Sequence, residues 1–301
     1  MKKILGIIGS PRKLGNCEIM VKEIGRQITV PHELRLLRLT EFNVLPCRGC
    51  YACLFNEEKC IQDDDFQRIL DSILDADALI VAVPTYFLGA NACLKRLLDR
   101  GLAFYAHIDK LWGKSAVGVA IAGIPTKEGH TLLGIQNFLK MILTEIKQTR
   151  ICYGALPGEV FLNQQNIEAA AKLAAALFAP APCKEGSVCP LCGGDTFRFM
   201  GNDRVHCLLC SNPGTIHMDT DRLEFRIHKS GHELFLSKEE ALHHKEWLLQ
   251  MKARYLEQKE KLKEITLAYR KPEEWIRPRE QRSGSEDQLS RVGGQKERLK
   301  E

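Results

Sequence analysis

Strand-like and helix-like segments alternate along the first 180 residues of this 301-residue chain. The strand-like runs are mostly apolar, which is typical of strands buried on both faces of a parallel sheet. They span 3–9, 33–39, 78–83, 115–123 and 150–156, and the helix-like segments span 17–28, 64–76, 92–105, 131–146 and 166–178. The alternation predicts an α/β domain, a three-layer sandwich of the flavodoxin-like or Rossmann kind with a five-stranded parallel sheet. In both kinds, ligands bind at the carboxyl ends of the strands.

The first loop, Gly9–Asn16, follows a buried strand and precedes a helix. Such a turn directs backbone N–H groups and a helix N-terminus at an anion. Ser10 and Asn16 add side-chain donors, and Arg12 adds positive charge. The spacing in GSPRKLGN matches neither a dinucleotide fingerprint nor a Walker A loop. A single phosphate, as on FMN, fits this short polar turn; a strand–helix turn without a ligand is the alternative.

The loops that follow the third and fourth strands end at the same edge of the predicted sheet. Aromatic and small residues at the end of a strand can hold a planar ring against the backbone. A turn that merely caps the core is the alternative for the loop after the third strand. The candidate ring-binding residues are Pro84, Thr85, Tyr86, Phe87, Gly89 and Ala90, with Gly123 from the fourth strand's loop.

Twelve cysteines are many for this chain, and eight of them fall in two clusters. In a protein without secretion signals, clustered cysteines indicate metal binding or redox chemistry more often than disulfides. The first cluster holds Cys47, Cys50, Cys53 and Cys60, and its first three members have the spacing of bacterial ferredoxins. The long connection that carries them is also typical of a functional loop. The sequence therefore favours a 4Fe–4S cluster, with zinc and free thiols as alternatives.

The second cluster consists of two C-x2-C pairs separated by fourteen residues. Two such knuckles around short β-like runs predict a tetrahedral site of four sulfurs, as in a zinc ribbon. The segment CPLCG is also typical of a rubredoxin, so a mononuclear iron is the alternative, and spacing alone does not separate the two metals. The ligands of this second site are Cys189, Cys192, Cys207 and Cys210.

The remaining chain is predicted to form smaller parts. A segment rich in proline and small residues, 178–187, is typical of a linker. We expect a domain at 1–180, a zinc-ribbon or rubredoxin-like module at 181–236, and an amphipathic helix at 237–271. Ser237 and Glu240 form a capping box that would open this helix. The polar tail, 272–301, is predicted to be disordered.

Here a family resemblance is clear. GSPRKLGN, the segment PTYFLGANACLKRLLDR (84–100) and the cysteines between them resemble the NADPH-dependent FMN reductase superfamily, and more narrowly the iron–sulfur flavoproteins. The resemblance covers residues 1–180 and implies a flavodoxin-like fold. It implies that Ser10, Arg12 and Asn16 bind the FMN phosphate and that residues 84–90 contact the isoalloxazine ring. Cys17 stands where the family usually has a Thr or Ser hydroxyl.

The same resemblance implies a 4Fe–4S cluster that lies near FMN across a subunit interface, and hence a homodimer or homotetramer. Such a protein would relay electrons between a one-electron donor, ferredoxin-like, and an acceptor. NAD(P)H is the alternative donor. Two other functions stay open: an NAD(P)H-dependent FMN or quinone reductase that binds zinc instead of a cluster, and a non-enzymatic redox sensor that docks through the ribbon.

Charge and hydrophobicity limit the cellular location and the classes of partner that we expect for this protein. The formal net charge is +5, which permits acidic partners but does not require them, and a nucleic-acid partner is not expected. The apolar run at the N-terminus is shorter than that of a signal peptide, and no run approaches the about 20 apolar residues of a membrane span. We therefore expect a cytoplasmic protein without a membrane partner. No protein general base is needed for electron transfer, so no catalytic residue is nominated.

Overall fold

The computed structural model describes residues 1–55, 59–180, 187–219, 222–270 and 276. By packing, the chain divides into a unit at 1–251 and a second unit at 252–301. The domain bounds expected from the sequence stay predictions. Most of the predicted linker lies outside the described residues, and so does the predicted polar tail apart from Ile276.

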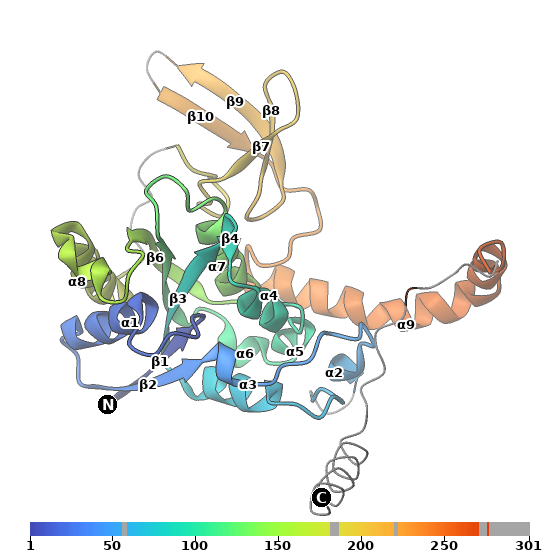
Figure 1. The fold of residues 1–301 in the computed structure, drawn as a ribbon. Helices are drawn as coiled ribbons and strands as arrows, with labels where there is room; N and C mark the ends of the chain where they lie inside the picture. The colour runs from blue at the N-terminus through green and yellow to red at the C-terminus, as the bar shows by residue number, and fades with distance from the viewer. Residues whose placement is uncertain (56–58, 181–186, 220–221, 271–275, 277–301) are drawn as a thin grey trace, which may run out of the picture. The chain divides into compact units, whose positions relative to one another are not determined.

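Five parallel strands, the number that the sequence predicts, form the central sheet, and their order is β2-β1-β3-β5-β6 (Figure 1). A sixth strand that the sequence analysis missed, β4 (Gly89–Ala90), pairs antiparallel with the end of β3, so the sheet has six strands. Because β4 has only two residues, its sequence carries no alternation pattern that could reveal it. The parallel strands are β1 (Lys2–Ile8), β2 (His32–Arg38), β3 (Ala78–Tyr86), β5 (Ser115–Ala122) and β6 (Glu145–Tyr153).

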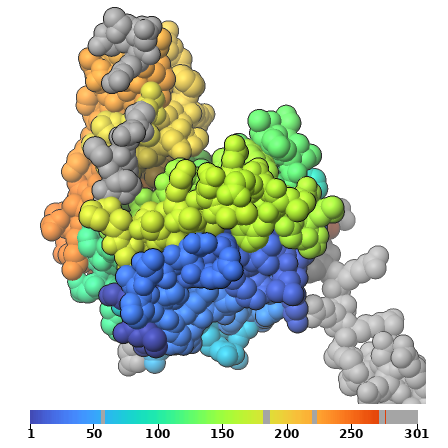
Figure 2. All heavy atoms as spheres, turned by 90° about the vertical axis from the view of Figure 1, so that its left-hand side faces the viewer, coloured from blue at the N-terminus to red at the C-terminus, as the bar shows by residue number. Residues whose placement is uncertain are grey.

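Helices cover both faces of the sheet. On one face α1 (Asn16–Gln27) and α8 (Gln164–Leu177) lie side by side, and their apolar residues pack on β1, β3 and β5 (Figure 2). The other face is covered chiefly by α3, α4 and α7, with short helices beside them. The helices on this second side are α2 (Ala52–Phe55), α3 (Phe66–Asp75), α4 (Ala92–Leu98), α5 (Leu102–Tyr105), α6 (Ile108–Leu111) and α7 (Thr131–Met141). Two short 3-10 helices span Leu39–Glu41 and Glu159–Leu162.

Two predicted helices end earlier than expected. The segment 131–146 is helical only to Met141, because Leu143 adopts a φ of 66° and Thr144 bonds back to the Leu139 carbonyl. The strand β6 then begins at Glu145, five residues before its predicted start. The segment 92–105 is also interrupted, since the N–H groups of Arg100 and Gly101 bond three residues back and tighten the chain into a turn.

The cysteine-rich segment forms an antiparallel sheet in the order β10-β9-β8-β7. This confirms the short β-like runs expected around the second cysteine cluster. The module is tied to the flavodoxin-like part, since the Tyr105 hydroxyl donates to the Leu234 carbonyl at 3.0 Å. The strands are β7 (Phe197–Phe199), β8 (Arg204–Cys207), β9 (Pro213–Asp219) and β10 (Arg222–Ile227).

The long helix α9 spans Lys238–Leu267 and begins where the capping box predicts. The Ser237 hydroxyl accepts the Glu240 N–H at 3.2 Å, which satisfies one of the unpaired donors at the helix start. Ala241 and Leu248 are the buried residues of α9, and its later apolar residues, such as Tyr255, are exposed. Among the described helices, none is long and apolar enough to cross a membrane.

Candidate functional site

A cavity of about 200 Å³ opens at the carboxyl edge of the parallel sheet. It brings together eight predicted residues from three loops: Ser10, Arg12, Asn16, Cys17, Pro84, Thr85, Tyr86 and Gly123. Three lining residues, Ile121, Gly154 and Ala155, were not predicted. Gly154 and Ala155 follow β6, so the rule that ligands bind at strand ends could have found them once the end of β6 was known.

Hydrogen bonds tie the loops around this cavity. The Asn16 amide nitrogen donates to the Gly154 carbonyl at 2.8 Å, and the Asn16 amide oxygen accepts the Gly158 N–H at 3.0 Å. The Arg12 guanidinium donates to the Ala155 carbonyl at 3.1 Å. These hydrogen bonds occupy part of the Arg12 and Asn16 side-chain groups that the sequence analysis assigned to a phosphate. Phosphate binding by Arg12 and Asn16 therefore stays a prediction.

The first loop is also clamped from outside the cavity. The Arg38 guanidinium donates to the carbonyls of Ser10 and Arg12 at 3.0 and 2.9 Å and pairs with the Glu18 carboxylate. Burial raises the pKa of Glu18, but hydrogen bonds from Lys22 and Arg38 outweigh it and lower that pKa to about 2. The loop is thus held in one conformation before any ligand binds, which reduces the entropic cost of binding.

Among the residues that the structure describes, the Thr85 hydroxyl in the cavity has no hydrogen-bond partner. The Thr85 hydroxyl oxygen is buried, lines the cavity and makes no hydrogen bond. A buried hydroxyl without a partner is costly, so such an atom at a strand end marks a place for a polar ligand group. The Ser10 hydroxyl, 5% exposed, accepts the Arg12 N–H at 3.3 Å and keeps its own proton to donate. This lining fits a ligand with hydrogen-bonding groups, such as FMN.

Cys17 lies at the start of α1 and lines the same cavity. Burial, followed by the nearby Cys93 thiol, raises the pKa of Cys17 to about 12. The Cys17 side chain is therefore a neutral thiol near pH 7, and it offers a ligand only a weak donor.

The remaining predicted ring-binding residues lie beside the cavity in the β3–β4 hairpin. Its two turn residues, Phe87 and Leu88, have φ values of 48° and 64°, although neither is a glycine. The Phe87 side chain is fully exposed and Leu88 is 52% exposed. Gly89 faces the His130 ring so closely that a Cβ would lie 2.8 Å from its Nε2 atom. Ala90 lines a neighbouring cavity together with His130.

The first cysteine cluster lies in the connection between β2 and α3. Cys47 and Cys50 are exposed, while Cys53 and Cys60 are half-buried and pack against the core. Burial, followed by the nearby Cys60, Cys47 and Cys50 thiols, raises the pKa of Cys53 to about 11. The Cys53 thiol therefore lies within electrostatic range of the other three. Four cysteine thiolates are the ligands that a 4Fe–4S cluster requires.

The second cysteine cluster is a compact set of four buried sulfurs. Among the described residues, Cys189, Cys192, Cys207 and Cys210 place their sulfurs within 4.8 Å of one another. The Gly194 N–H donates to the Cys192 sulfur at 3.3 Å, and a Cβ at Gly194 would lie 3.1 Å from the Cys207 sulfur. Hydrogen bonds from the other three thiols, first Cys192, lower the pKa of Cys189. Four buried and converging sulfurs fit one tetrahedral metal ion.

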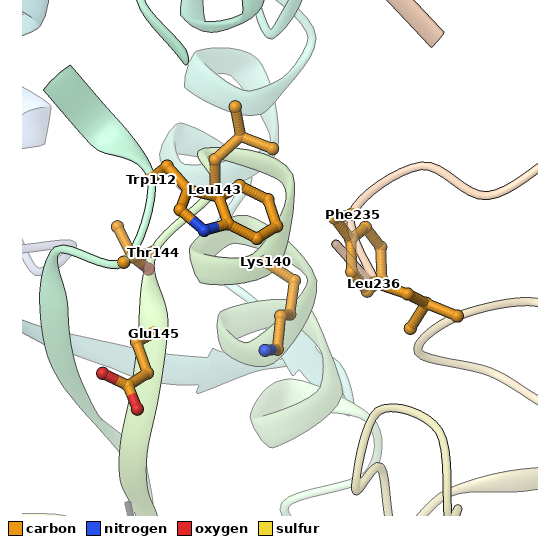
Figure 3. A pocket seen from close by; sticks show the side chains of 8 residues that line it. Trp112, Lys140, Leu143, Thr144, Glu145, Phe235 and Leu236 are labelled. Carbon is orange, nitrogen blue, oxygen red and sulfur yellow. The ribbon is translucent and has the colours of Figure 1, made fainter. Parts of the chain in front are cut away.

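A separate cavity of about 320 Å³ lies where α6 and α7 end near the segment that leads into α9 (Figure 3). Trp112 lines one side, and Phe235 and Leu236 line the opposite side. The Lys140 and Glu145 side chains complete the lining. No predicted site residue contributes to it, so this cavity belongs to the junction between the two sheets.

Comparison with known proteins identifies the family of this chain. The family model described as NADPH-dependent FMN reductase matches residues 2–143. An iron–sulfur flavoprotein of Archaeoglobus fulgidus is 30% identical over 164 residues, which cover 52% of this chain and 71% of that protein. An iron–sulfur flavoprotein of Methanocaldococcus jannaschii is 36% identical over 141 residues, which cover 45% of this chain and 70% of that protein. A second relative from Archaeoglobus fulgidus is matched over 48% of its length, about half.

A solved structure shares nearly the whole architecture. The protein titled flavone reductase superposes with a TM-score of 0.69 over 92% of this chain and 99% of its own, at 20% sequence identity. At that identity the likeness shows the fold alone.

The fold, the cavity at the strand ends and the matching family model define an FMN-dependent oxidoreductase. Within that class, the chain belongs to the iron–sulfur flavoproteins.

Proposed function

We propose that this protein is an electron-transfer flavoprotein that relays electrons through a 4Fe–4S cluster and FMN. The observation that carries the proposal is the unpartnered Thr85 hydroxyl in a polar cavity, at the edge of the sheet where the connection to the four cysteines also begins. An iron–sulfur cluster passes single electrons, and FMN takes one or two, so the pair can join a one-electron carrier to a two-electron reaction.

The residues of the chain would act by binding and orienting. Ser10, Arg12 and Asn16, with the neutral Cys17 thiol, would surround the FMN phosphate at the start of α1. Thr85 would donate its unused proton to the ring system. The cluster would be held by Cys47, Cys50, Cys53 and Cys60 through their thiolates. The other residues proposed to contact the ring are Pro84, Tyr86, Phe87, Gly89, Ala90 and Gly123.

We propose a structural role for the second cysteine cluster. Its four sulfurs are buried beside a small antiparallel sheet, so a zinc ion there would stabilise the fold. Mononuclear iron would bind the same four sulfurs and would add a redox centre. The metal content decides between the two.

The proposed partners follow from the same chemistry. A ferredoxin-like protein or NAD(P)H would supply electrons, and a second copy of the chain would bring its cluster near FMN in a homodimer or homotetramer. No disulfide joins the cysteines that the structure describes, which suits a reducing compartment and favours the cytoplasm.

The test is a count of iron, sulfide, zinc and FMN per chain in anaerobically purified protein. About four irons with four sulfides, one zinc and one FMN are expected for this proposal. A fifth iron without zinc would assign iron to the second site. FMN with zinc alone would refute the cluster and select a plain NAD(P)H-dependent FMN or quinone reductase. Partner binding that depends on the redox state, without enzymatic turnover, would instead indicate a non-enzymatic redox sensor.

Two variants assign the metals to their sites and act as controls for each other. Cys50→Ser is expected to lose the iron and sulfide while the zinc stays. Cys210→Ser is expected to lose the zinc and the order of the small sheet while the iron stays. Loss of both metals in either variant would contradict two independent sites.

A further inference from the structure

The second half of α9 carries exposed apolar side chains on one side of the helix. Tyr255, Leu262 and Ile265 share that side, because residues three, four and seven apart are neighbours on a helix surface. They are 54%, 38% and 53% exposed. Leu248, seven residues before Tyr255, is only 5% exposed, so the same side is covered earlier in the helix. We call Tyr255, Leu262 and Ile265 the α9 stripe.

Basic side chains flank the α9 stripe on both edges. Arg254 and Lys261 each precede a stripe residue by one position, and Lys259 lies on the other edge. All three are exposed, and among the residues that the structure describes they form no ion pair. The acidic residues of this part of the chain lie on the opposite side of the helix and are Glu257, Glu260 and Glu264. The helix therefore presents an apolar strip between two positive edges.

The spacing of the α9 stripe is that of a coiled-coil seam. With Tyr255 and Leu262 at heptad position a, Ile265 falls at d, and Gln258 holds the other d position. The flanking bases then fall at e and g, the positions that meet the side chains of a partner helix. A helix that lies on a membrane buries a wider apolar face. The narrow stripe therefore favours a helical partner.

The charges of the two edges oppose pairing of the α9 stripe with a second copy of itself. In a parallel pair, Arg254 at g of one helix would meet Lys259 at e of the other. In an antiparallel pair, g would face g and e would face e, which again sets base against base. Like charges held together at an interface are costly. The complementary partner is therefore a helix with acidic edges.

We propose that the second half of α9 is a docking site for an acidic amphipathic helix of a partner protein. The apolar residues of that helix would pack on the α9 stripe, and its carboxylates would lie against Arg254, Lys259 and Lys261. Burial of the apolar residues supplies the affinity, while the charged edges select the partner and its orientation. This inference concerns a binding surface and does not depend on the proposed cofactors.

The test is a titration of a fluorescein-labelled peptide with the full-length protein, followed by fluorescence anisotropy. The peptide is a synthetic amphipathic helix with leucine at a and d and glutamate at e and g. It is expected to bind, and to bind more weakly when the salt concentration rises from about 0.1 M to about 1 M. The same peptide with lysine at e and g is expected not to bind. Absence of binding by the acidic peptide, or equal binding of both peptides, would overturn the proposal.

Leu262→Ala and Leu256→Ala form a matched pair of variants. Both replace an exposed leucine of the same helix, and alanine keeps the helix because of its high helix propensity. Leu262 belongs to the α9 stripe, so its replacement should weaken binding of the acidic peptide about tenfold or more. Leu256 lies off the stripe, and its replacement should leave binding unchanged. Equal losses in the two variants would contradict docking on the stripe.

Reversal of charge tests the edges. Replacement of both Arg254 and Lys261 by glutamate is expected to exchange the preference, so that the lysine peptide binds and the glutamate peptide does not. An unchanged preference would overturn the proposed role of the edges.

Two further measurements distinguish the other occupants. A wild-type oligomer that Leu262→Ala dissociates in sedimentation would assign the stripe to a second copy and overturn the proposal. Binding to vesicles of phosphatidylserine and phosphatidylcholine that is lost in Leu262→Ala would assign it to a membrane surface, with the same consequence. A sedimentation profile that Leu262→Ala leaves unchanged and an absence of vesicle binding are the expected results.

Discussion

The side chain of Asn16 is joined to the backbone at Gly154, 138 residues further along the chain, by a hydrogen bond of 2.8 Å. Asn16 starts α1 and is 8% exposed, and Gly154 follows the last parallel strand. A Cβ at Gly154 would lie 2.7 Å from the Val160 nitrogen and 3.1 Å from the Asn16 amide nitrogen. The loops after the first and last of these strands are thereby locked into one wall of the cavity.

Replacement of Asn16 by alanine is expected to loosen that wall. It leaves the Gly154 carbonyl and the Gly158 N–H without their partner, which costs about 1–3 kcal/mol of unfolding free energy. FMN binding is expected to weaken at the same time, as measured by quenching of flavin fluorescence. Asn163→Ala, which removes only the cap of α8, is the control: about 1 kcal/mol of stability is lost and FMN affinity stays unchanged.

Thr85→Val is expected to act in opposite directions on stability and on binding. Valine has the same shape and removes a buried hydroxyl that has no partner, so the unfolding free energy of the protein without FMN should stay equal or rise. FMN affinity should fall about tenfold, or about 1.4 kcal/mol, if the hydroxyl bonds the cofactor. Chemical denaturation and flavin titration measure the two quantities.

The control for this substitution is Thr131→Val. The Thr131 hydroxyl is fully buried and donates to the Glu128 carbonyl at 2.7 Å, so its loss should lower stability by about 1 kcal/mol. If Thr85→Val and Thr131→Val lowered the unfolding free energy equally, the Thr85 hydroxyl would have a partner within the protein.

Glycine at position 88 is expected to stabilise the hairpin turn. Leu88 has a φ of 64°, a backbone conformation that costs a residue with a side chain about 1 kcal/mol or more and costs glycine little. Leu88→Gly should therefore raise the midpoint of thermal unfolding, with a gain of about 1 kcal/mol at most. Leu162→Gly, at an exposed residue without a positive φ, should lower it. A lower midpoint for Leu88→Gly would show that its side-chain contacts outweigh the strain.

Glu18 is expected to make stability depend on acid pH. Its pKa is lowered to about 2 in the folded protein from an ordinary value of 4.5, so the folded state binds its proton less readily than the unfolded state. The ion pair therefore stabilises the fold above pH 4.5, and this contribution of about 3 kcal/mol is lost as pH falls from 4.5 to 2.

Glu18→Gln should remove that contribution at pH 7 and flatten the pH dependence below pH 5, as measured by urea unfolding at several pH values. Glu23→Gln on the same helix is the control. Glu23 pairs with Arg26, whose side chain is 76% exposed, so its replacement should cost less than about 1 kcal/mol. An unchanged pH profile in Glu18→Gln would contradict the ion pair's role.

The sequence by itself determined the order of most strands and helices along the chain. It also predicted that the ligand-binding loops lie at the carboxyl ends of the strands. Apolar runs and helical periodicity are local properties, so they predict elements before any packing is known. The spacing of the second cysteine cluster likewise predicted a compact set of four sulfurs, because two short knuckles can converge in few ways. The ends of helices were harder, since α7 stops where Leu143 takes a positive φ that no local pattern required.

Only the tertiary structure decided which side chains complete the sites. Gly154 enters the cavity because β6 lies at the end of the sheet opposite β2 and its loop folds back on α1. Arg100 reaches Asp64 and the Leu45 carbonyl because the chain turns after α4 and buries the guanidinium there. A charged residue in a sequence carries no mark of its partner, since ion pairs between distant residues depend on packing rather than on spacing along the chain.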